Sequence, residues 1–490
     1  MTTGLAEHFV PTTAIPGEHE HRRNLIAFQH AKVVQLSNSR RRHIYLHKYV
    51  NHLLRHHILP GSRVLDVGCG DGSLLGSLAS SRGVGIDLSA ELVEQASQTY
   101  PGLCFKACAI EDFAPEPGET FDYIVFSGVL QQLYDVHSVL QKVRGFCHPR
   151  TRLIICTYSR VWQPAIRLAE GIKFKCPVPD ESWIPPGELD NLLDQSDFEL
   201  IRRQPAMLMP AGIPVVSRLM NRWIAPLPLI RQACLLNITI ARPVNIAAKP
   251  GSSLSIIVPL RNEAGNVGPL LKRIAKIADR QEVIFIEGHS TDNTWEVINR
   301  AIADYQGDLI LSCHQQTGKG KRDAVRLGFS KADGEVVAIL DGDISVPPEE
   351  LPRFYELIRH GKCEFANGSR LVYPMEAQAM QFLNMIANKC FGYMFSYLLG
   401  QSVRDTLCGT KVLSRDNYER IAANRAYFGD FDPFGDFDLL FGAARQNLKI
   451  MDVPVHYKQR VYGKTNISRF SHGLLLLRMC GFAARKLCFV

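Results

Sequence analysis

Short apolar runs and helically spaced apolar positions alternate along two long stretches of the chain. Runs typical of buried strands occur at 63–67, 83–87, 121–127 and 152–157, and again at 254–258, 282–286, 308–311 and 336–340. Between them, apolar residues at helical spacing predict helices, among others over 40–58, 186–194, 295–305 and 319–330. Strands that alternate with helices predict an α/β fold built on parallel sheets.

The chain has 490 residues, which is too long for one hydrophobic core, so two or three domains are expected. Residues 243–253 hold Pro, Gly and Ser between the two patterns and predict a linker. We expect a lead-in over 1–39, a first α/β domain over 40–242, a second over 254–470, and a basic amphipathic tail over 471–490.

Composition narrows the function classes. The net charge of +8 suits phosphorylated ligands or an anionic membrane surface, but it is too dispersed to predict a nucleic-acid partner. Thirteen cysteines without a CxxC pair, and no signal peptide, predict reduced thiols in the cytoplasm. No apolar run reaches the ~18 residues of a spanning helix, so any attachment to the inner face of a membrane is expected to be peripheral.

The first pattern carries a glycine-rich turn after its first strand. Residues 63–67 run into Gly68, Gly70 and Gly72, and apolar helical positions follow. This strand, turn and helix unit lets a ligand approach the backbone. Asp87 ends the next strand about twenty positions later, where a carboxylate can bind ribose hydroxyls.

The ordered set resembles the class I S-adenosylmethionine (SAM)-dependent methyltransferases over about residues 45–160. The resemblance implies a Rossmann-like sheet with SAM as cofactor, bound by Asp66, Gly68, Cys69, Gly70, Gly72, Asp87, Glu111 and Asp112. Many members carry a histidine where this chain has Gln132. A domain that binds NAD is the alternative, although the turn differs from the dinucleotide GxGxxG. No residue stands out as the base for methyl transfer.

The second pattern carries its most informative residues after the run Val336–Leu340. Asp341 and Asp343, with Gly342 between them, follow this strand and are expected at the carboxyl edge of the sheet, where open α/β sheets bind ligands. Two such carboxylates can share a hard divalent cation, Mg²⁺ or Mn²⁺, that also holds a diphosphate. A plain Asp-Gly turn between strands is the alternative.

Residues 254–470 resemble the family 2 glycosyltransferases of the GT-A fold, and within them the dolichol- or polyprenol-phosphate hexose synthases. The matching segments are 259–263, 287–292, 341–350, 368–370, 404–411 and 453–464. The resemblance implies a metal at Asp341 and Asp343 and a nucleotide sugar bound by Pro259, Asn262, Glu263, Glu287, Lys319 and Asp341. It also implies catalytic roles for Asp341 and Asp343.

Two kinds of acceptor remain open. A hydroxyl acceptor needs a carboxylate base, for which Asp436 and Asp438 are the candidates. A polyprenyl-phosphate acceptor is already ionised and needs cations instead, for which Arg370, Arg460 and Lys464 are the candidates. Residues 382–399 and the tail are then expected to lie against lipid, with ordinary buried helices as the alternative.

The main hypothesis is a bifunctional enzyme that transfers a hexose from a nucleotide sugar, with polyprenyl phosphate as the expected acceptor, and that methylates a glycan or related small molecule. A glycosyltransferase for hydroxyl acceptors, docked by a non-catalytic SAM-binding module, is the alternative. A polysaccharide polymerase is disfavoured because no membrane spans are predicted. The sequence does not indicate an oligomeric state.

Overall fold

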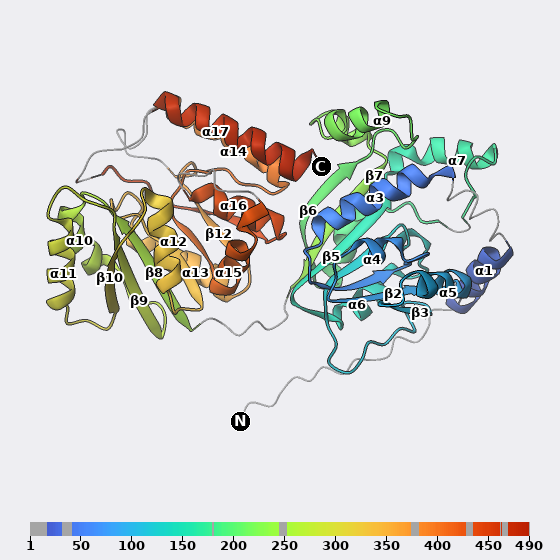
Figure 1. The fold of residues 1–490 in the computed structure, drawn as a ribbon, viewed down its shortest axis with the longest axis horizontal. Helices are drawn as coiled ribbons and strands as arrows, with labels where there is room; N and C mark the ends of the chain where they lie inside the picture. The colour runs from blue at the N-terminus through green and yellow to red at the C-terminus, as the bar shows by residue number, and fades with distance from the viewer. Residues whose placement is uncertain are drawn as a thin grey trace. The chain divides into compact units, whose positions relative to one another are not determined.

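The computed structural model describes residues 17–31, 42–178, 181–244, 252–373, 382–427, 435–460, 462 and 469–489. They form two compact units, residues 1–246 and 247–490, and each contains a seven-stranded mixed sheet with helices on both faces (Figure 1). The predicted α/β fold with two domains is confirmed. Strand β7 ends at Pro243 and strand β8 begins at Ser253, on either side of the predicted linker.

The sheet of the first unit has the order β3-β2-β1-β4-β5-β7-β6. Strands β1 to β5 are parallel, while β7 runs antiparallel to both β5 and β6. The strands are β1 (Arg63–Val67), β2 (Arg82–Asp87), β3 (Cys104–Ala107), β4 (Phe121–Ser127), β5 (Cys147–Tyr158), β6 (Phe198–Ala206) and β7 (Leu236–Pro243). The chain leaves β1 toward β2 and β3 and then returns to β4 on the other side of β1. This reversal places a ligand cleft at the carboxyl ends of β1 and β4.

Side chains of the central strands alternate between two hydrophobic clusters. Leu65 and Val67 of β1 belong to the cluster on one face, and Val64 belongs to the cluster on the other. The covering elements are α1 (Glu18–Ala31), α3 (Ile44–His57), α4 (Ser73–Ser77), α5 (Ala90–Thr99), η1 (Leu130–Gln132), α6 (Val136–Arg144), η2 (Arg160–Trp162), α7 (Gln163–Gly171), α8 (Pro186–Gln195), α9 (Val216–Leu219), the π-helical turn η3 (Met220–Ile224) and η4 (Ile230–Ala233).

The sheet of the second unit has the order β10-β9-β8-β11-β13-β12-β14. Its strands are β8 (Ser253–Leu260), β9 (Arg280–Glu287), β10 (Ile310–Gln315), β11 (Val336–Ile339), β12 (Phe365–Ser369), β13 (Lys411–Ser414) and β14 (Ile450–Pro454). Strands β8 to β11 are parallel, but β13 is antiparallel to both β11 and β12. The expectation of a purely parallel sheet is therefore wrong here, because the long excursion after β12 returns the chain in the opposite direction.

Strand β11 lies at the centre of this sheet, as its apolar run predicts. All four of its residues are buried, and Ala338 pairs with Ile256 on one side and Val412 on the other. The helices are α10 (Ala264–Arg273), α11 (Thr294–Ala303), α12 (Lys321–Lys331), α13 (Leu351–Arg359), α14 (Phe382–Leu399), α15 (Arg415–Ala423), α16 (Asp436–Arg445) and α17 (Arg469–Ala483), with turns η5 (Pro348–Glu350), η6 (Arg425–Tyr427) and η7 (Ala484–Cys488).

Two helices in this unit begin at residues that the sequence alone does not indicate. Asparagine is favoured at helix N-caps, but Asn266 lies inside α10, where its buried side chain donates to Glu263, and Glu263 stands at the N-cap. Helix α12 begins at Lys321, so exposed Lys319 precedes it instead of starting it.

Helices α14 and α17 lie side by side on the second unit (Figure 1). Each buries one face in the same hydrophobic cluster, through Phe395 and Leu399 on α14 and Met479 on α17. Their outer faces expose Tyr393 (80%) and Leu477 (52%). Among the described residues, no helix is both long and apolar enough to cross a bilayer.

Candidate functional sites

The glycine-rich turn of the first unit adopts a conformation that its glycines make possible. Gly68, Gly70 and Gly72 have φ angles of 75°, 54° and 71°, in the left-handed region that disfavours other side chains. A β-carbon on Gly68 would also lie 2.9 Å from Cβ of Val129. The predicted turn is therefore formed at the carboxyl end of β1.

Asp87 ties this turn to the end of β2. Its two carboxylate oxygens accept hydrogen bonds from the backbone N–H of Gly70 at 2.8 Å and of Ser89 at 2.9 Å. The carboxylate thus holds the turn after β1 and the loop after β2 in one arrangement.

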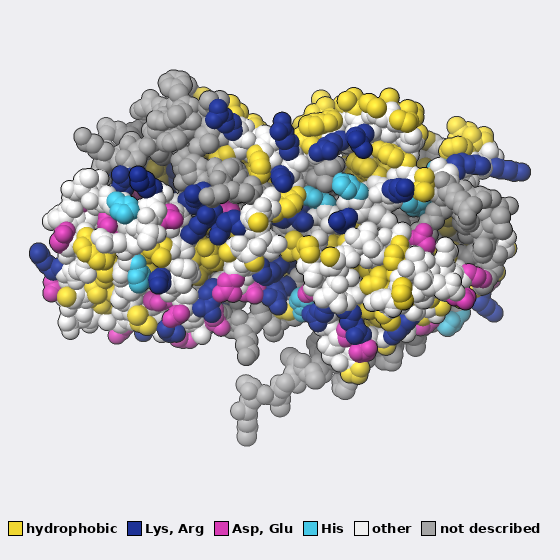
Figure 2. Space-filling view, viewed as in Figure 1, with side chains coloured by type: hydrophobic (Ala, Val, Ile, Leu, Met, Phe, Trp, Pro, Cys, Tyr) yellow, Lys and Arg dark blue, Asp and Glu magenta, His cyan; other side chains and the backbone are white. Residues whose placement is uncertain are grey.

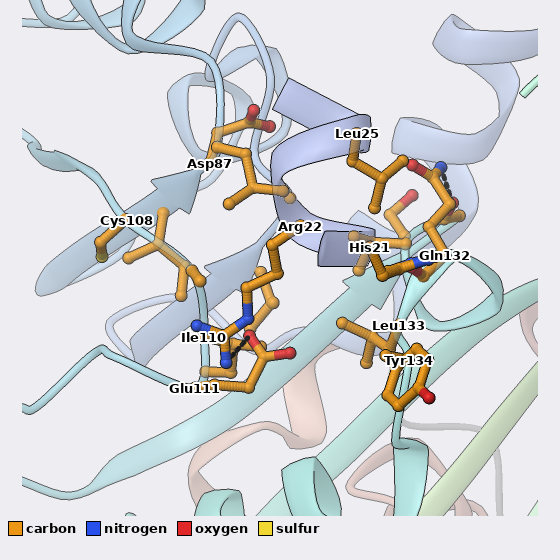
Figure 3. A pocket seen from close by; sticks show the side chains of 18 residues that line it. His21, Arg22, Leu25, Asp87, Cys108, Ile110, Glu111, Gln132, Leu133 and Tyr134 are labelled. Carbon is orange, nitrogen blue, oxygen red and sulfur yellow. Dashed lines mark hydrogen bonds and ion pairs between the residues drawn. The ribbon is translucent and has the colours of Figure 1, made fainter. Parts of the chain in front are cut away.

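A cavity opens beside the turn, at the reversal point of the strand order (Figure 3). Gly68, Asp87, Glu111 and Gln132 line it, together with residues of helix α1. Of the predicted SAM residues, Gly68, Asp87 and Glu111 thus face one cavity. Cys69 and Asp66 are buried under the turn, and burial raises the pKa of the Cys69 thiol, which keeps it protonated.

Helix α1 supplies a wall of this cavity that sequence reasoning missed. His21, Arg22 and Leu25 line it, and Leu25 is 4% exposed. Arg22 points toward Glu111 at 3.8 Å (Figure 3). It also donates to Asp112 at 3.0 Å. The predicted acidic pair is therefore contacted by a cationic residue about ninety positions earlier in the chain. His21 Nε2 lies 2.9 Å from the carbonyl oxygen of Gln132.

Three of the predicted nucleotide-sugar residues, Asn262, Glu263 and Glu287, lie at the carboxyl ends of β8 and β9. Asn262 Oδ1 accepts from the Thr291 N–H at 2.7 Å, and Glu287 Oε1 accepts from the Ser290 N–H at 2.5 Å. Pro259 belongs to β8 itself, while Lys319 is exposed ahead of α12. The two loops are thus fastened to each other at the carboxyl edge of the sheet.

Three loops at this edge contain strained backbone. Asn262, His289 and Ile344 have φ angles of 56°, 55° and 56°, which are unfavourable for side chains with a β-carbon and especially for β-branched Ile344. Such strain concentrates where the surrounding structure holds a ligand site in place. The loops after β8, β9 and β11 therefore share strained backbone conformations of the kind found at functional sites.

Asp341 and Asp343 follow β11, and each has a cationic partner. Asp341 Oδ1 lies 2.5 Å from Lys321 Nζ, and Asp343 pairs with Arg460, which is also 3.9 Å from Glu263. Although burial opposes ionisation, Lys321 holds the pKa of Asp341 below its usual range. The ion pair with Asp341 is formed by Lys321, two residues after the predicted Lys319.

Glu263 has an unusual titration. Burial is the largest influence and raises its pKa to about 7; Asp343 adds to the rise, whereas Arg460 and the hydrogen bond from Asn266 oppose it. The carboxylic acid of Glu263 is therefore half-protonated near neutral pH, beside the Asp341–Asp343 pair.

The residues fit a hard divalent cation. Among the described residues no cluster of three His, Cys, Asp or Glu side chains could hold a metal on its own. Mg²⁺ and Mn²⁺, however, are commonly held by one or two carboxylates together with oxygens of a phosphorylated substrate. Asp341 and Asp343 supply that number and type of ligand.

The two candidate bases for a hydroxyl acceptor are both engaged in ion pairs. Asp436 lies 3.0 Å from Nζ of fully buried Lys411. Asp438 lies 3.0 Å from Arg326 and 2.7 Å from Arg425. Both candidate carboxylates are therefore engaged by cationic side chains of the same unit.

The cationic residues predicted to hold a phosphate acceptor differ in their surroundings. Arg370 forms a bidentate pair with buried Asp405 at 2.7 and 2.8 Å, which commits two of its nitrogens. Arg460 lies at the Asp341–Asp343 pair itself. Lys464 lies outside the described residues.

Comparison with known protein families assigns each unit. Residues 58–192 match the model "Methyltransferase domain", and residues 255–422 match the model "Glycosyl transferase family 2". The chain joins a methyltransferase domain to a family 2 glycosyltransferase domain. Both family resemblances drawn from the sequence are confirmed, and the alternative of an NAD-binding domain falls away.

Curated relatives of the glycosyltransferase domain include a dolichyl-phosphate hexose transferase from Haloferax volcanii, 28% identical over 45% of this chain and 89% of that protein. The low-salt glycan biosynthesis hexosyltransferase Agl6 of the same organism is 25% identical over 45% of this chain and 51% of its own length. A dolichol-phosphate mannosyltransferase from Pyrococcus furiosus is 26% identical over 44% of this chain and 59% of its own length. The chain thus spans about half the length of the last two.

The comparison with solved structures finds methyltransferases among its matches. One is the putative methyltransferase complexed with the Trm112 activator from Haloferax volcanii, at 16% identity and a TM-score of 0.34, covering 44% of this chain and 97% of that chain. Another is the SAM-dependent methyltransferase from Mesorhizobium loti, at 19% identity and a TM-score of 0.31, covering 39% of this chain and 95% of that chain.

Proposed function

We propose that the glycosyltransferase domain transfers a hexose from a nucleotide sugar to a polyprenyl phosphate, and that the methyltransferase domain methylates a glycan or related small molecule with SAM. The observation that carries the first proposal is the state of Asp436 and Asp438. Both acidic candidates for deprotonating a hydroxyl are held in ion pairs with Lys411, Arg326 and Arg425. A phosphate acceptor requires no base.

The donor site is assigned to the edge formed by the loops after β8, β9 and β11. Asp341 and Asp343 would hold a divalent cation, which when bound would neutralise charge on the departing diphosphate. Lys321 keeps Asp341 ionised. Arg460 adds a fixed positive charge at the same edge. Asn262 and Glu287 hold the two nucleotide-side loops together.

The names of the relatives support this acceptor. Two of them are named for transfer to dolichyl or dolichol phosphate, and they match this chain across the glycosyltransferase domain. In the hydroxyl-acceptor alternative, Asp436 or Asp438 would take the acceptor's proton while it is paired with a cation.

The methyltransferase proposal rests on the cavity beside the glycine turn. Asp87 would bind the ribose of SAM, and the edge near Glu111 would receive its adenine. SAM supplies the methyl group, while the protein positions the acceptor and excludes water. Helix α1 covers the cavity with His21 and Leu25 and so contributes to that exclusion.

Product analysis tests the glycosyltransferase proposal. The full chain is incubated with a panel of nucleotide sugars, Mn²⁺ and polyprenyl phosphate, and lipid products are identified by mass spectrometry. We expect a lipid-linked hexose that is absent when a chelator is added in excess. Nucleotide-sugar turnover that persists in the chelator would contradict the metal assignment. Isothermal titration of SAM tests the other domain separately, and no detectable heat would favour a non-catalytic docking module.

A further inference from the structure

The methyltransferase domain has a surface that exposes many large apolar side chains, whereas such side chains are usually buried in soluble proteins. Of twenty large apolar side chains that are exposed among the described residues, four lie in 161–174 and seven in 213–229. Within these two segments the most exposed are Leu229 (87%), Val215 (79%), Ile172 (68%), Leu168 (67%) and Val161 (67%). Figure 2 shows hydrophobic side chains gathered over α9 and near α7. We call residues 160–174 and 213–231 the apolar–basic face.

Buried polar side chains hold the backbone of this face in place. Asn221 is 2% exposed; its Oδ1 accepts from the N–H groups of Leu208 and Met209 at 2.8 Å, and its Nδ2 donates to Tyr45 on α3. Ser217 is 1% exposed and accepts from the Ile213 N–H at 2.9 Å. The segment therefore forms a defined structure with polar groups inside and apolar groups outside.

The two segments belong to one surface. Trp162 Nε1, at the start of α7, donates to the Ala233 carbonyl at 2.8 Å, and the Ser159 N–H donates to the Leu235 carbonyl at 2.7 Å. Exposed apolar patches of this extent mark interaction sites, because soluble proteins rarely leave them uncovered.

The charges of the apolar–basic face identify its partner. Residues 207–235 contain no Asp or Glu, and Arg218 and Arg222 are exposed beside the apolar side chains. Arg222 lies 5.7 Å from the ring centre of Trp223. On the other segment Arg167 and Lys173 are exposed, whereas the acidic Glu170 is paired with Lys175.

We infer that the apolar–basic face docks on the surface of an anionic phospholipid membrane. Exposed Leu and Trp side chains insert between headgroups, while arginines meet lipid phosphates. A protein partner would need a matching acidic rim, whereas an anionic bilayer offers negative charge over its whole surface. The inference is independent of both enzymatic activities, although it would bring the chain to a lipid-linked acceptor.

Vesicle sedimentation with the full chain tests this inference. Vesicles of phosphatidylcholine are compared with vesicles that also contain phosphatidylglycerol, at low and high salt. We expect binding only to the anionic vesicles, weakened by salt. Leu219→Ser should weaken binding about tenfold, as expected for one buried leucine. Ile310→Ser in the other domain is the matched control, since Leu219 is 52% and Ile310 is 48% exposed.

Lipids with brominated chains locate the contact directly, because bromine quenches only tryptophans inside the bilayer. Wild-type fluorescence should fall on binding, and Trp223→Phe should lose most of that decrease while it retains binding. Equal quenching in the two proteins, or equal vesicle binding by Leu219→Ser and Ile310→Ser, would overturn the inference. A wild-type dimer that Leu219→Ser converts to a monomer in light scattering, without vesicle binding, would instead assign the face to a second copy of the chain.

Discussion

Removal of the Asp87 carboxylate should weaken SAM binding by an amount that the structure sets. Asp87 faces the cavity and uses two lone-pair positions on the backbone N–H groups of Gly70 and Ser89. In the proposed SAM complex, ribose hydroxyls would donate hydrogen bonds to this carboxylate. A hydrogen bond to a charged group contributes about 1.5–3 kcal/mol, so Asp87→Ala should raise the Kd about 10- to 150-fold.

Isothermal titration with SAM and with S-adenosylhomocysteine measures this change without turnover. Asp71→Ala is the matched control, because Asp71 lies on the same turn and accepts from the Ser73 N–H at 3.1 Å but does not line the cavity. It should leave the affinity within about threefold of wild type, a difference below 1 kcal/mol. Unchanged affinity in Asp87→Ala, or an equal loss in Asp71→Ala, would refute the placement of the ribose.

Three further predictions concern residues that the structure singles out. Asp343→Ala should abolish glycosyl transfer without lowering the thermal unfolding temperature, and measurable transfer by a folded variant would argue against a metal at this position. Arg22→Ala should speed SAM release in stopped-flow measurements, because α1 loses its ion pairs with Glu111 and Asp112. Arg23→Ala, at an exposed position of the same helix, is the control and should not change the release rate. Equal release rates in the two variants would exclude α1 from contact with bound SAM. Glu263 has a folded pKa of about 7 against an ordinary value of 4.5, so the folded state binds its proton more tightly and wild type loses stability as pH rises between those values. Glu263→Gln should lack this loss of stability. If guanidinium unfolding shows that the stability difference between wild type and Glu263→Gln does not change with pH, the raised pKa of Glu263 is contradicted.

Features encoded locally in the sequence were predictable. The run Val336–Leu340 predicted a central buried strand, and Asp341 and Asp343 follow it at the edge of the sheet. The glycines at 68, 70 and 72 predicted the turn, because few residues other than glycine adopt left-handed φ angles without strain. The position of Asp87 at the end of the next strand was predictable from its distance of about twenty residues to that turn.

Features that depend on distant parts of the chain were missed. The lead-in has no clear apolar period, so nothing in it indicated that Arg22 would reach Glu111 and Asp112. The opposite direction of β13 depends on the long path after β12, which periodicity does not describe. Periodicity likewise does not show which apolar residues of 213–229 are exposed, because their exposure depends on how the segment packs on the rest of the domain.

The choice of acceptor is the central claim, and a competition experiment tests it most directly. Polyprenyl phosphate and polyprenol of the same chain length are offered together to the full chain, with the nucleotide sugar that supports transfer and with Mn²⁺. The ion pairs of Asp436 and Asp438 predict that the hexose is transferred to the phosphate and not to the alcohol. Transfer to polyprenol at a comparable or higher rate would show that a base is available and would contradict the proposed function.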